Sequence, residues 1–467
     1  MPAKFVSIDR SIPMLMPLDL RDWLPENHLV HFILDAVSKL NLISFNVNTS
    51  GSGSEQYPPD MLLALLMYCY ATGRFSSRSI EAATHVDVAV RYICGGDRHP
   101  DHSTICAFRR SNGEAFKETF VKVLMLAGEA RHISRFGTIA VDGTKIEANA
   151  SKHSAVSYKR GGEIVKHLEL EIAALIAKAE STDSAIQKCS LDIPAEITRR
   201  ETRMNQIVMA LNDIETRHEE GRAEHQAEYE EKMLSRRQIE EDGRKPRGPA
   251  PSPPPEKPDD KAQINFTDSE SRIMKAGDGA HFEQSYNAQA AVEIESMLIV
   301  GGYVTDKCND KQELEPIISS VPAEVMEVEA ALADTGYFNS DAIMRIESET
   351  KVEVYCATGR QGHARTVDEL FQGDVEPAPA PPNATLKEKM ARKLKTAKGK
   401  SLYKKRKYTV EPVFGIIKEV LGFRKFLMRG LEKVNIEWDI IKTAYNLKRM
   451  AKLSQRIIMP IAQENVA

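Results

Sequence analysis

The chain has 467 residues, with 63 Lys or Arg against 67 Asp or Glu and a formal net charge of −4. This length allows two or three domains with at least one large core, and the overall charge gives no hint of a nucleic-acid partner, so segregated charge must be examined locally. The six cysteines form no CxxC pair and are too sparse for a secreted disulfide scaffold. No apolar run is long enough for a signal peptide or a membrane span, so we expect a cytoplasmic protein without a membrane partner.

Residues 1–135 have the apolar pattern of an all-α domain. Apolar side chains recur at spacings of three and four in HLVHFILDAVSKL and in PDMLLALLMYCYATG. Further on, Asp101 or Ser103 can cap a short helix that presents Arg109 and Arg110 outward, before a glycine-containing turn and another helix. This order is similar to a helix-turn-helix, so we expect either a module that binds DNA ends or a purely structural helical domain.

The same segment contains Cys94, His99, His102 and Cys106, at spacings that resemble those of a zinc site. No other feature supports a zinc ion, because the segment has the pattern of a loop that leads into a helix. We therefore predict no zinc site there.

A short buried strand follows and leads into an acid. Ile139, Ala140 and Val141 form a continuous apolar run that ends at Asp142 and Gly143. A charge beside a buried strand is costly unless it is paired or binds a metal ion. Asp142 is therefore a candidate metal ligand, and the alternative is an aspartate that only caps the turn at Gly143.

Residues 152–263 interrupt the strand pattern and predict a helical hairpin insertion. Two charge-rich helical stretches carry apolar stripes, with Ile164 and Leu168 in the first and Ile207 and Leu211 in the second. The proline-rich stretch RGPAPSPPPEKPDDK then predicts an extended linker. We expect the insertion to serve packing or dimerisation rather than the reading of bases.

Strands return after the insertion. Residues 285–295 and 297–307 predict a tight hairpin, and a helix separates this hairpin from a strand that ends at Asp334 before Gly336. Asp306 also stands at a strand end and is the rival of Asp334. Turn chemistry alone is the alternative interpretation of Asp334.

The C-terminal part concentrates positive charge. The segment Lys387–Lys407 holds 11 Lys or Arg and one acid; beside a catalytic acid such a run predicts contact with DNA phosphates, and the alternative is a solvated face. Glu411 follows, and Pro412 places it in the first helical turn, where the helix dipole favours a carboxylate. At about 100° per residue, Lys418 shares the helix face of Glu411. The opposite face, which should pack, is formed by Val413, Ile416, Ile417 and Val420.

The order of these elements predicts the fold. A strand with an acid, a hairpin, a helix, a strand that ends in an acid, another strand and a helix with an acid indicate an α/β protein with a ribonuclease H-like core and a mixed sheet, formed by residues 136–151 and 264–455. In this order Asp334 is on the strand next to that of Asp142, whereas Asp306 ends the outer arm of a hairpin. Three carboxylates there would hold two Mg2+ ions about 3.5 to 4 Å apart for attack on a phosphodiester.

The chain resembles bacterial insertion-sequence transposases of the DDE class, in the group with a helical N-terminal domain before the catalytic core. The resemblance rests on PDHSTICAFRR, AVDGTKIEANAS, YNAQAAVE, ADTGYFN and YKKRKYTVEPVFGIIK. It implies a metal-binding catalytic triad of Asp142, Asp334 and Glu411, with two Mg2+ ions for which Mn2+ can substitute. It also implies that Lys418 contacts DNA near the cleaved end, and that a homodimer acts on double-stranded terminal repeats and target DNA.

The family pattern places Tyr, Arg, Glu and Lys at fixed intervals. Tyr403 and Arg406 keep the first interval and Glu411 and Lys418 keep the last, but four residues separate Arg406 from Glu411. Lys407 would restore the usual gap of three, so either Arg406 or Lys407 fills the Arg position.

The expected function is a transposase that cuts the ends of its element and joins them to target DNA. Its predicted DNA contacts are Arg109 and Arg110 in the N-terminal domain and Tyr403, Lys404, Lys405, Arg406, Lys407 and Lys418 in the C-terminal part. One alternative is a metal-dependent nuclease that cuts without joining. Another is a catalytically inactive DNA-binding relic, against which the three intact acids argue.

Overall fold

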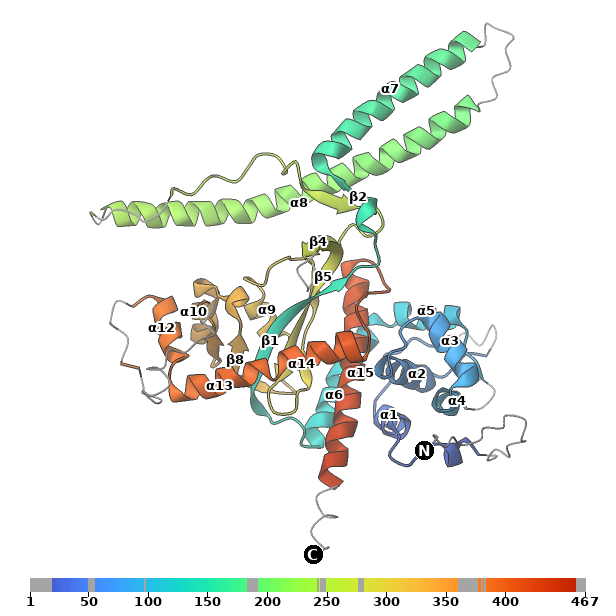
Figure 1. Ribbon diagram of the computed structural model, residues 1–467, viewed down its shortest axis with the longest axis vertical. Coiled ribbons are helices and arrows are strands. Elements are labelled where there is room, and N and C mark those ends of the chain that lie inside the picture. Colours follow the sequence, from blue (N-terminus) through green and yellow to red (C-terminus); the bar gives the residue numbers. More distant parts are fainter. Residues whose placement is uncertain are drawn as a thin grey trace, which may run out of the picture.

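The computed structural model describes residues 19–48, 55–95, 98–182, 192–241, 243, 249–275, 281–359, 377–378, 381 and 384–458. Helices surround a sheet in the body of the molecule, and two long helices project from it (Figure 1). The predicted mixed α/β architecture with a helical N-terminal region is thus confirmed. None of the described helices is both long and apolar enough to cross a membrane.

The N-terminal region is helical. Its elements are η1 (Leu20–Trp23), α1 (Leu29–Ser38), α2 (Pro59–Ala71), α3 (Ser77–Val86), α4 (Val88–Cys94), α5 (His102–Ser111) and α6 (Gly113–Glu129). Pro59 is the first residue of α2, and its lack of an N–H costs no hydrogen bond because the first helical N–H has no partner within the helix. Every residue from Leu62 to Ala71 is buried, since α2 packs against α1, α4 and the C-terminal helix α15 (Leu431–Ile458).

A mixed sheet forms the centre of the molecule. Its strands are β1 (Phe136–Glu147), β4 (Arg272–Lys275), β5 (Phe282–Glu293), β6 (Ile299–Gly301), β7 (Val304–Thr305), β8 (Glu327–Ala333) and β9 (Glu353–Cys356). The main order is β4-β5-β1-β8-β9, and β6 and β7 also pair with β5, which forms the predicted hairpin. β5 runs antiparallel to β1, whereas β8 runs parallel to β1 and β9 parallel to β8.

Helices follow the strands toward the C-terminus. They are α9 (Leu314–Ser319), η3 (Thr335–Tyr337), α10 (Ser340–Glu349), α12 (Leu386–Lys393), α13 (Ala397–Lys407), α14 (Val410–Gly415) and the π-helical turn η4 (Ile416–Val420). The basic segment is therefore helical, with capping threonines at Thr385 and Thr396. The widened turn η4 alters the helix period, so Val420, which was predicted to pack, is 68% exposed.

One hydrophobic core joins the helical region to the sheet. Buried side chains of the N-terminal helices, the central strands and α15 form a single cluster. Trp438 of α15 is fully buried in it and donates its Nε1–H to the carbonyl oxygen of Gln289 on β5 at 3.1 Å. Helix α15 therefore connects the two regions, and Figure 1 shows it running between them.

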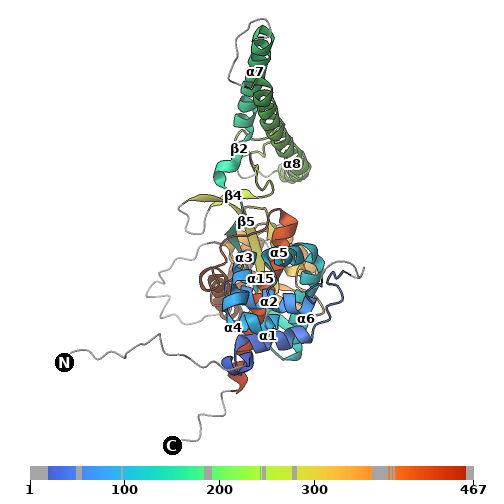
Figure 2. The ribbon, with the colours of Figure 1, turned by 90° about the vertical axis from the view of Figure 1, so that its right-hand side faces the viewer.

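The projecting arm consists of η2 (Lys152–Ser154), β2 (Ala155–Ser157), α7 (Tyr158–Thr182), α8 (Ile193–Glu241) and β3 (Gln263–Asn265). Helices α7 and α8 pack against each other, and β2 pairs with β3 at the base of the arm. A small separate apolar cluster forms there, from Val156, Ala210, Ile214 and Ile264. Both ribbon views show the arm standing clear of the body (Figures 1 and 2).

The proline-rich stretch returns along α8. Residues 249–262 contain neither helix nor strand, as predicted for an extended linker. The carbonyl oxygen of Pro249 accepts a hydrogen bond from Arg236 at 3.1 Å, and that of Pro255 lies 3.1 Å from Nε2 of His218. These contacts lie in the second half of α8, which continues beyond the helical hairpin (Figure 1).

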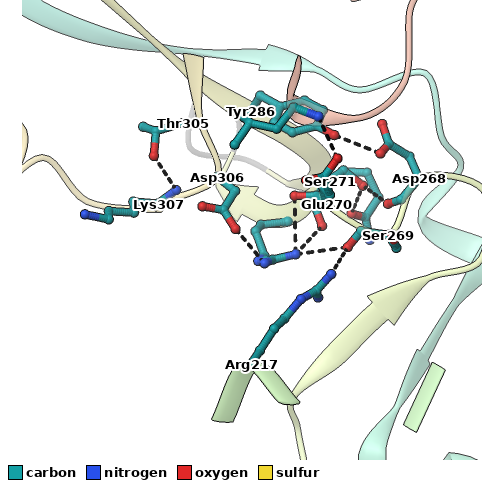
Figure 3. A network of polar contacts seen from close by, with 12 residues as sticks. Arg217, Asp268, Ser269, Glu270, Ser271, Tyr286, Thr305, Asp306 and Lys307 are labelled. Carbon is teal, nitrogen blue, oxygen red and sulfur yellow. Dashed lines mark hydrogen bonds and ion pairs between the residues drawn. The ribbon is translucent and has the colours of Figure 1, made fainter. Parts of the chain in front are cut away.

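Polar contacts tie the arm to the sheet. Arg217 of α8 donates to the carbonyl oxygen of Ser269 at 2.6 Å, and Arg272 donates to that same oxygen at 3.1 Å. Arg272 also pairs with Asp306 at 2.5 Å, while the Tyr286 hydroxyl donates to Asp268 at 2.8 Å. Figure 3 shows this network around residues 268–271. Asp306, the rival of Asp334 in the sequence, is engaged in this network.

Candidate active site

Asp142 lies in the middle of β1, at the point where one neighbouring strand stops. β8 pairs with β1 up to Ala140, whereas β5 stays paired as far as Glu147. The alternative of a strand-end aspartate that caps a turn at Gly143 is therefore wrong, because β1 continues to Glu147 beside its antiparallel partner. On the other edge, beyond Ala140, side chains from later elements approach Asp142.

The surroundings of Asp142 change its acidity. Burial raises the pKa of its carboxyl to about 7; attraction to Arg406 opposes this shift, and repulsion from Asp334 adds to it. Its Oδ1 atom accepts the N–H of Gly143 at 2.9 Å. A strongly perturbed carboxyl that faces other charged groups is typical of a functional site.

Asp334 follows β8 directly. Its Oδ1 atom accepts the N–H of Gly336 at 2.8 Å and thereby caps η3, so the turn role considered from the sequence is real. Its Oδ2 atom lies 3.8 Å from the Arg406 guanidinium. One oxygen thus holds the turn, and the other faces the site.

Glu411 is the second residue of α14, and Pro412 follows it in the first turn, as predicted. Its side chain is 59% exposed, and Oε1 lies 3.8 Å from Nη1 of Arg406. The helix dipole at this N-terminus attracts a carboxylate.

Arg406 brings the three acids together. Its side chain is only 7% exposed, and Nη2 lies 3.3 Å from Oδ2 of Asp142. The same guanidinium reaches Asp334 and Glu411. Lys407, by contrast, is exposed, so Arg406 is the cation that stands among the acids. The sequence alone had left both residues open for this position.

The donor set suits a hard divalent ion. Three carboxylates supply oxygen ligands of the kind that Mg2+ and Mn2+ prefer. Within the described parts of the chain, however, no three His, Cys, Asp or Glu side chains are already arranged to hold a metal ion. The position of Arg406 gives a physical reason, because its guanidinium lies between the acids and serves as their counter-ion.

The remaining C-terminal candidates differ in exposure. Lys404, Lys405 and Lys407 are exposed on α13, and Lys405 pairs with Glu295 at 2.5 Å. Tyr403 is half-buried. Lys418 is also half-buried, and its Nζ donates to the carbonyl oxygen of Lys145 on β1 at 2.7 Å.

The predicted outward pair on α5 is half wrong. Arg110 is exposed, but Arg109 is buried and donates to the Tyr70 hydroxyl at 2.8 Å and to the carbonyl oxygen of Phe75 at 3.0 Å. Arg109 therefore holds α2 and the following turn against α5. Its partners lie more than 30 positions earlier in the chain, so local helix periodicity could not reveal this role.

The residues of the suspected zinc spacing have other partners. His102 contacts Glu81 at 2.9 Å, His99 contacts the Thr84 hydroxyl at 3.1 Å, and the Cys106 thiol donates to Ser77 at 3.1 Å. These separate contacts give His99, His102 and Cys106 structural roles, and Cys94 is buried.

Sequence analysis missed a polar group next to the acids. Asp310, in the loop after β7, accepts hydrogen bonds from Asn287 and Gln289 on β5, both at 2.7 Å. The alternation of polar and small residues in YNAQAAVE was a signal, because Asn287 and Gln289 must share one face of a strand. The contact with Asp310 depends on a loop whose course the sequence does not specify.

Comparison with known families supplies an independent observation. A model described as a transposase domain matches residues 18–111, and a model described as a transposase DDE domain matches residues 379–451. Together they support an insertion-sequence DDE transposase. The DDE match contains Arg406, Glu411 and Lys418, whereas the N-terminal match ends at Ser111, the last residue of α5. Searches of curated proteins and of solved structures gave no significant match for the transposase.

Proposed function

We propose that this transposase cuts DNA at the ends of its element and joins those ends to target DNA in a metal-dependent reaction. The observation that carries the proposal is the convergence of Asp142, Asp334 and Glu411 on one guanidinium, from elements far apart in the chain. These three carboxylates would hold two Mg2+ or Mn2+ ions, which would activate the attacking oxygen and stabilise the leaving one.

The sheet topology supports a ribonuclease H-like core. The central strand has an antiparallel neighbour on one side and two parallel strands on the other. The strand before Asp334 is next to the strand of Asp142, as the sequence predicted. Asp142 lies on the central strand, and Asp334 follows the adjacent parallel strand. Residues 136–151 and 264–455 would form this catalytic domain, residues 1–135 would bind DNA ends, and residues 152–263 would form a separate helical insertion.

Arg406 would couple DNA to the metal site. Its guanidinium and a divalent ion would compete for the same carboxylate oxygens. A DNA phosphate that attracts Arg406 away from the acids would therefore favour binding of the ion. Lys404, Lys405 and Lys407 lie on the same helix and are exposed, so they would contact the DNA backbone. Lys418 would contact DNA near the cleaved end after release from the carbonyl oxygen of Lys145. We place the reaction in the cytoplasm, on double-stranded DNA, with two copies of the chain acting together.

The test separates binding from chemistry at Glu411. Glu411→Gln keeps the side-chain shape but removes one negative metal ligand, so Mn2+ binding and nicking should fall by about 100-fold, while end-DNA affinity stays near wild type. Glu419→Gln is the matched control, because Glu419 is exposed and pairs with Arg424 on the same segment. Calorimetry with Mn2+ and nicking at saturating DNA measure the effect. Normal nicking by Glu411→Gln would rule out the proposed site.

Neutralising Lys404, Lys405 and Lys407 to Gln should have the reverse effect. The slope of DNA affinity against salt should decrease by about 0.9 for each lost phosphate contact, while Mn2+ binding without DNA stays unchanged. An unchanged slope would mean that α13 is a solvated surface. Joining of a pre-cut end to target DNA distinguishes a transposase from a nuclease.

A further inference from the structure

Asp310 has an unusual position among the acids of the molecule. It lies in the loop between β7 and α9, and Asn287 and Gln289 both donate to its Oδ1 atom. Both amide side chains are fully buried, and they come from alternate positions of β5. One carboxylate oxygen of Asp310 is thus fixed by two donors from the same strand face.

Gly143 leaves the space that Asp310 occupies, and Gly336 lies next to it. A Cβ atom at Gly143 would lie 2.8 Å from Oδ1 of Asp310, and one at Gly336 would lie 3.7 Å from its Oδ2 atom and 3.0 Å from Oδ1 of Asp334. Gly143 follows Asp142 directly, and Gly336 stands two positions after Asp334. Asp310 therefore lies beside the backbone that follows each of the first two acids, at Gly143 in β1 and at Gly336 in the turn after β8.

A second observation concerns the side-chain amide of Asn287. The Oδ1 atom of Asn287 has no hydrogen-bond partner although the side chain is fully buried, and it lies 2.8 Å from the same Cβ position at Gly143. A buried acceptor without a partner is costly, and an amide oxygen is a good ligand for a hard cation. The nearby Nζ atom of Lys145 is also buried without a partner. The competing explanation is therefore that Asp310 only balances the positive charge of Lys145.

We propose that Asp310 is a fourth carboxylate of the metal centre and supplies a ligand beside Asp142 and Asp334. This inference rests on the proposed function. Two divalent ions bring four positive charges, whereas Asp142, Asp334 and Glu411 bring three negative ones. Asp310 provides the fourth, so that the loaded site would be neutral apart from Arg406 and the DNA.

The experiment measures Mn2+ binding to the full chain in the absence of DNA. Asp310→Asn keeps the size of the side chain and an oxygen that can accept the two amides, and it should bind Mn2+ about 10- to 100-fold more weakly or lose one of two ions. Asp306→Asn, four positions earlier on the same loop and paired with Arg272, is the matched control and should bind as wild type.

Further variants separate the explanations. If Asp310→Asn binds Mn2+ as wild type while Asp142→Asn loses binding, the fourth ligand is refuted and the proposed function stands. If neither variant loses binding, the metal site itself is refuted. Should Asp310→Asn fail to fold, Asp310→Glu restores the charge, and a folded Asp310→Glu that binds Mn2+ no better than Glu411→Gln would overturn the inference. If Asp310 only balances the charge of Lys145, then adding Lys145→Met to Asp310→Asn should restore stability, and wild type and both variants should bind Mn2+ equally.

Discussion

The body of the molecule and the projecting arm are stabilised by different interactions. In the body, the N-terminal helices, the sheet and α15 share one continuous apolar core. In the described part of the arm, apolar side chains such as Leu168 and Ile207 are buried on α7 and α8, and a small separate cluster lies at the base. The attachment of the arm to the sheet includes the polar network of Arg217 and residues 268–271 (Figure 3). The acids of the candidate site come entirely from the body. Precise placement of these acids thus depends on apolar packing, whereas the arm can change with little effect on them.

The largest expected effect comes from the side chain at the centre of the body. Trp438→Ala removes a fully buried indole that binds β5 from α15, the helix that packs against both regions, so the free energy of unfolding should fall by about 3 to 5 kcal/mol. Because the core is shared, the N-terminal helices and the sheet should still unfold in one transition. Tyr408→Ala is the control, since this aromatic ring is 68% exposed. Two separate transitions in a denaturant titration would show that the core is not shared.

A smaller effect concerns the acidity of Asp142. The folded pKa is about 7, whereas an unfolded aspartate titrates near 3.9, so the folded state binds the extra proton between these values. Stability of the metal-free protein should therefore fall as pH rises from about 4 to about 7, by at most about 1.4 kcal/mol per pH unit. Asp142→Asn removes this term. Urea titrations at several pH values should give a flatter profile for the variant, and equal slopes would contradict the buried, proton-binding carboxyl.

The smallest effect on the body should come from removal of the arm. Ser157 on β2 pairs with Gln263 on β3, so a short turn can replace residues 158–262 while both strands remain. We expect one cooperative thermal transition, with a midpoint within about 4 °C of wild type, as for a change near 1 kcal/mol. Calorimetry measures this directly. Aggregation without a cooperative transition would mean that the arm covers part of the core.

The sequence was sufficient where local pattern decides structure. The alternation and the apolar runs predicted the mixed sheet, and Pro412 placed Glu411 in a first helical turn, as the structure has it. Prediction from the sequence failed where a residue far away in the chain determines the position of a side chain. Asp142 is in mid-strand because β5 extends β1, and Arg109 is buried because Tyr70 accepts its hydrogen bond.

The candidate site shows the same division. Motif resemblance selected Asp142, Asp334 and Glu411, and the structure places all three around Arg406. Spacing alone could not decide between Arg406 and Lys407, since one helical residue either way changes which cation points inward. Asp310 was not predicted because it lies in a loop. The position of its side chain depends on tertiary contacts with Asn287 and Gln289.

The position of β1 has a consequence for synthesis of the chain. This central strand ends at Glu147, but its neighbours begin only at Phe282 and Glu327, after the whole arm. At a translation rate of roughly 5 to 20 residues per second, β1 leaves the ribosome roughly 7 to 27 seconds before β5 and longer before β8. During that interval a strand with buried Ile139, Ala140 and Val141 has both hydrogen-bonding edges open. Newly made chains should therefore need chaperones at this stage, and the long arm prolongs that need.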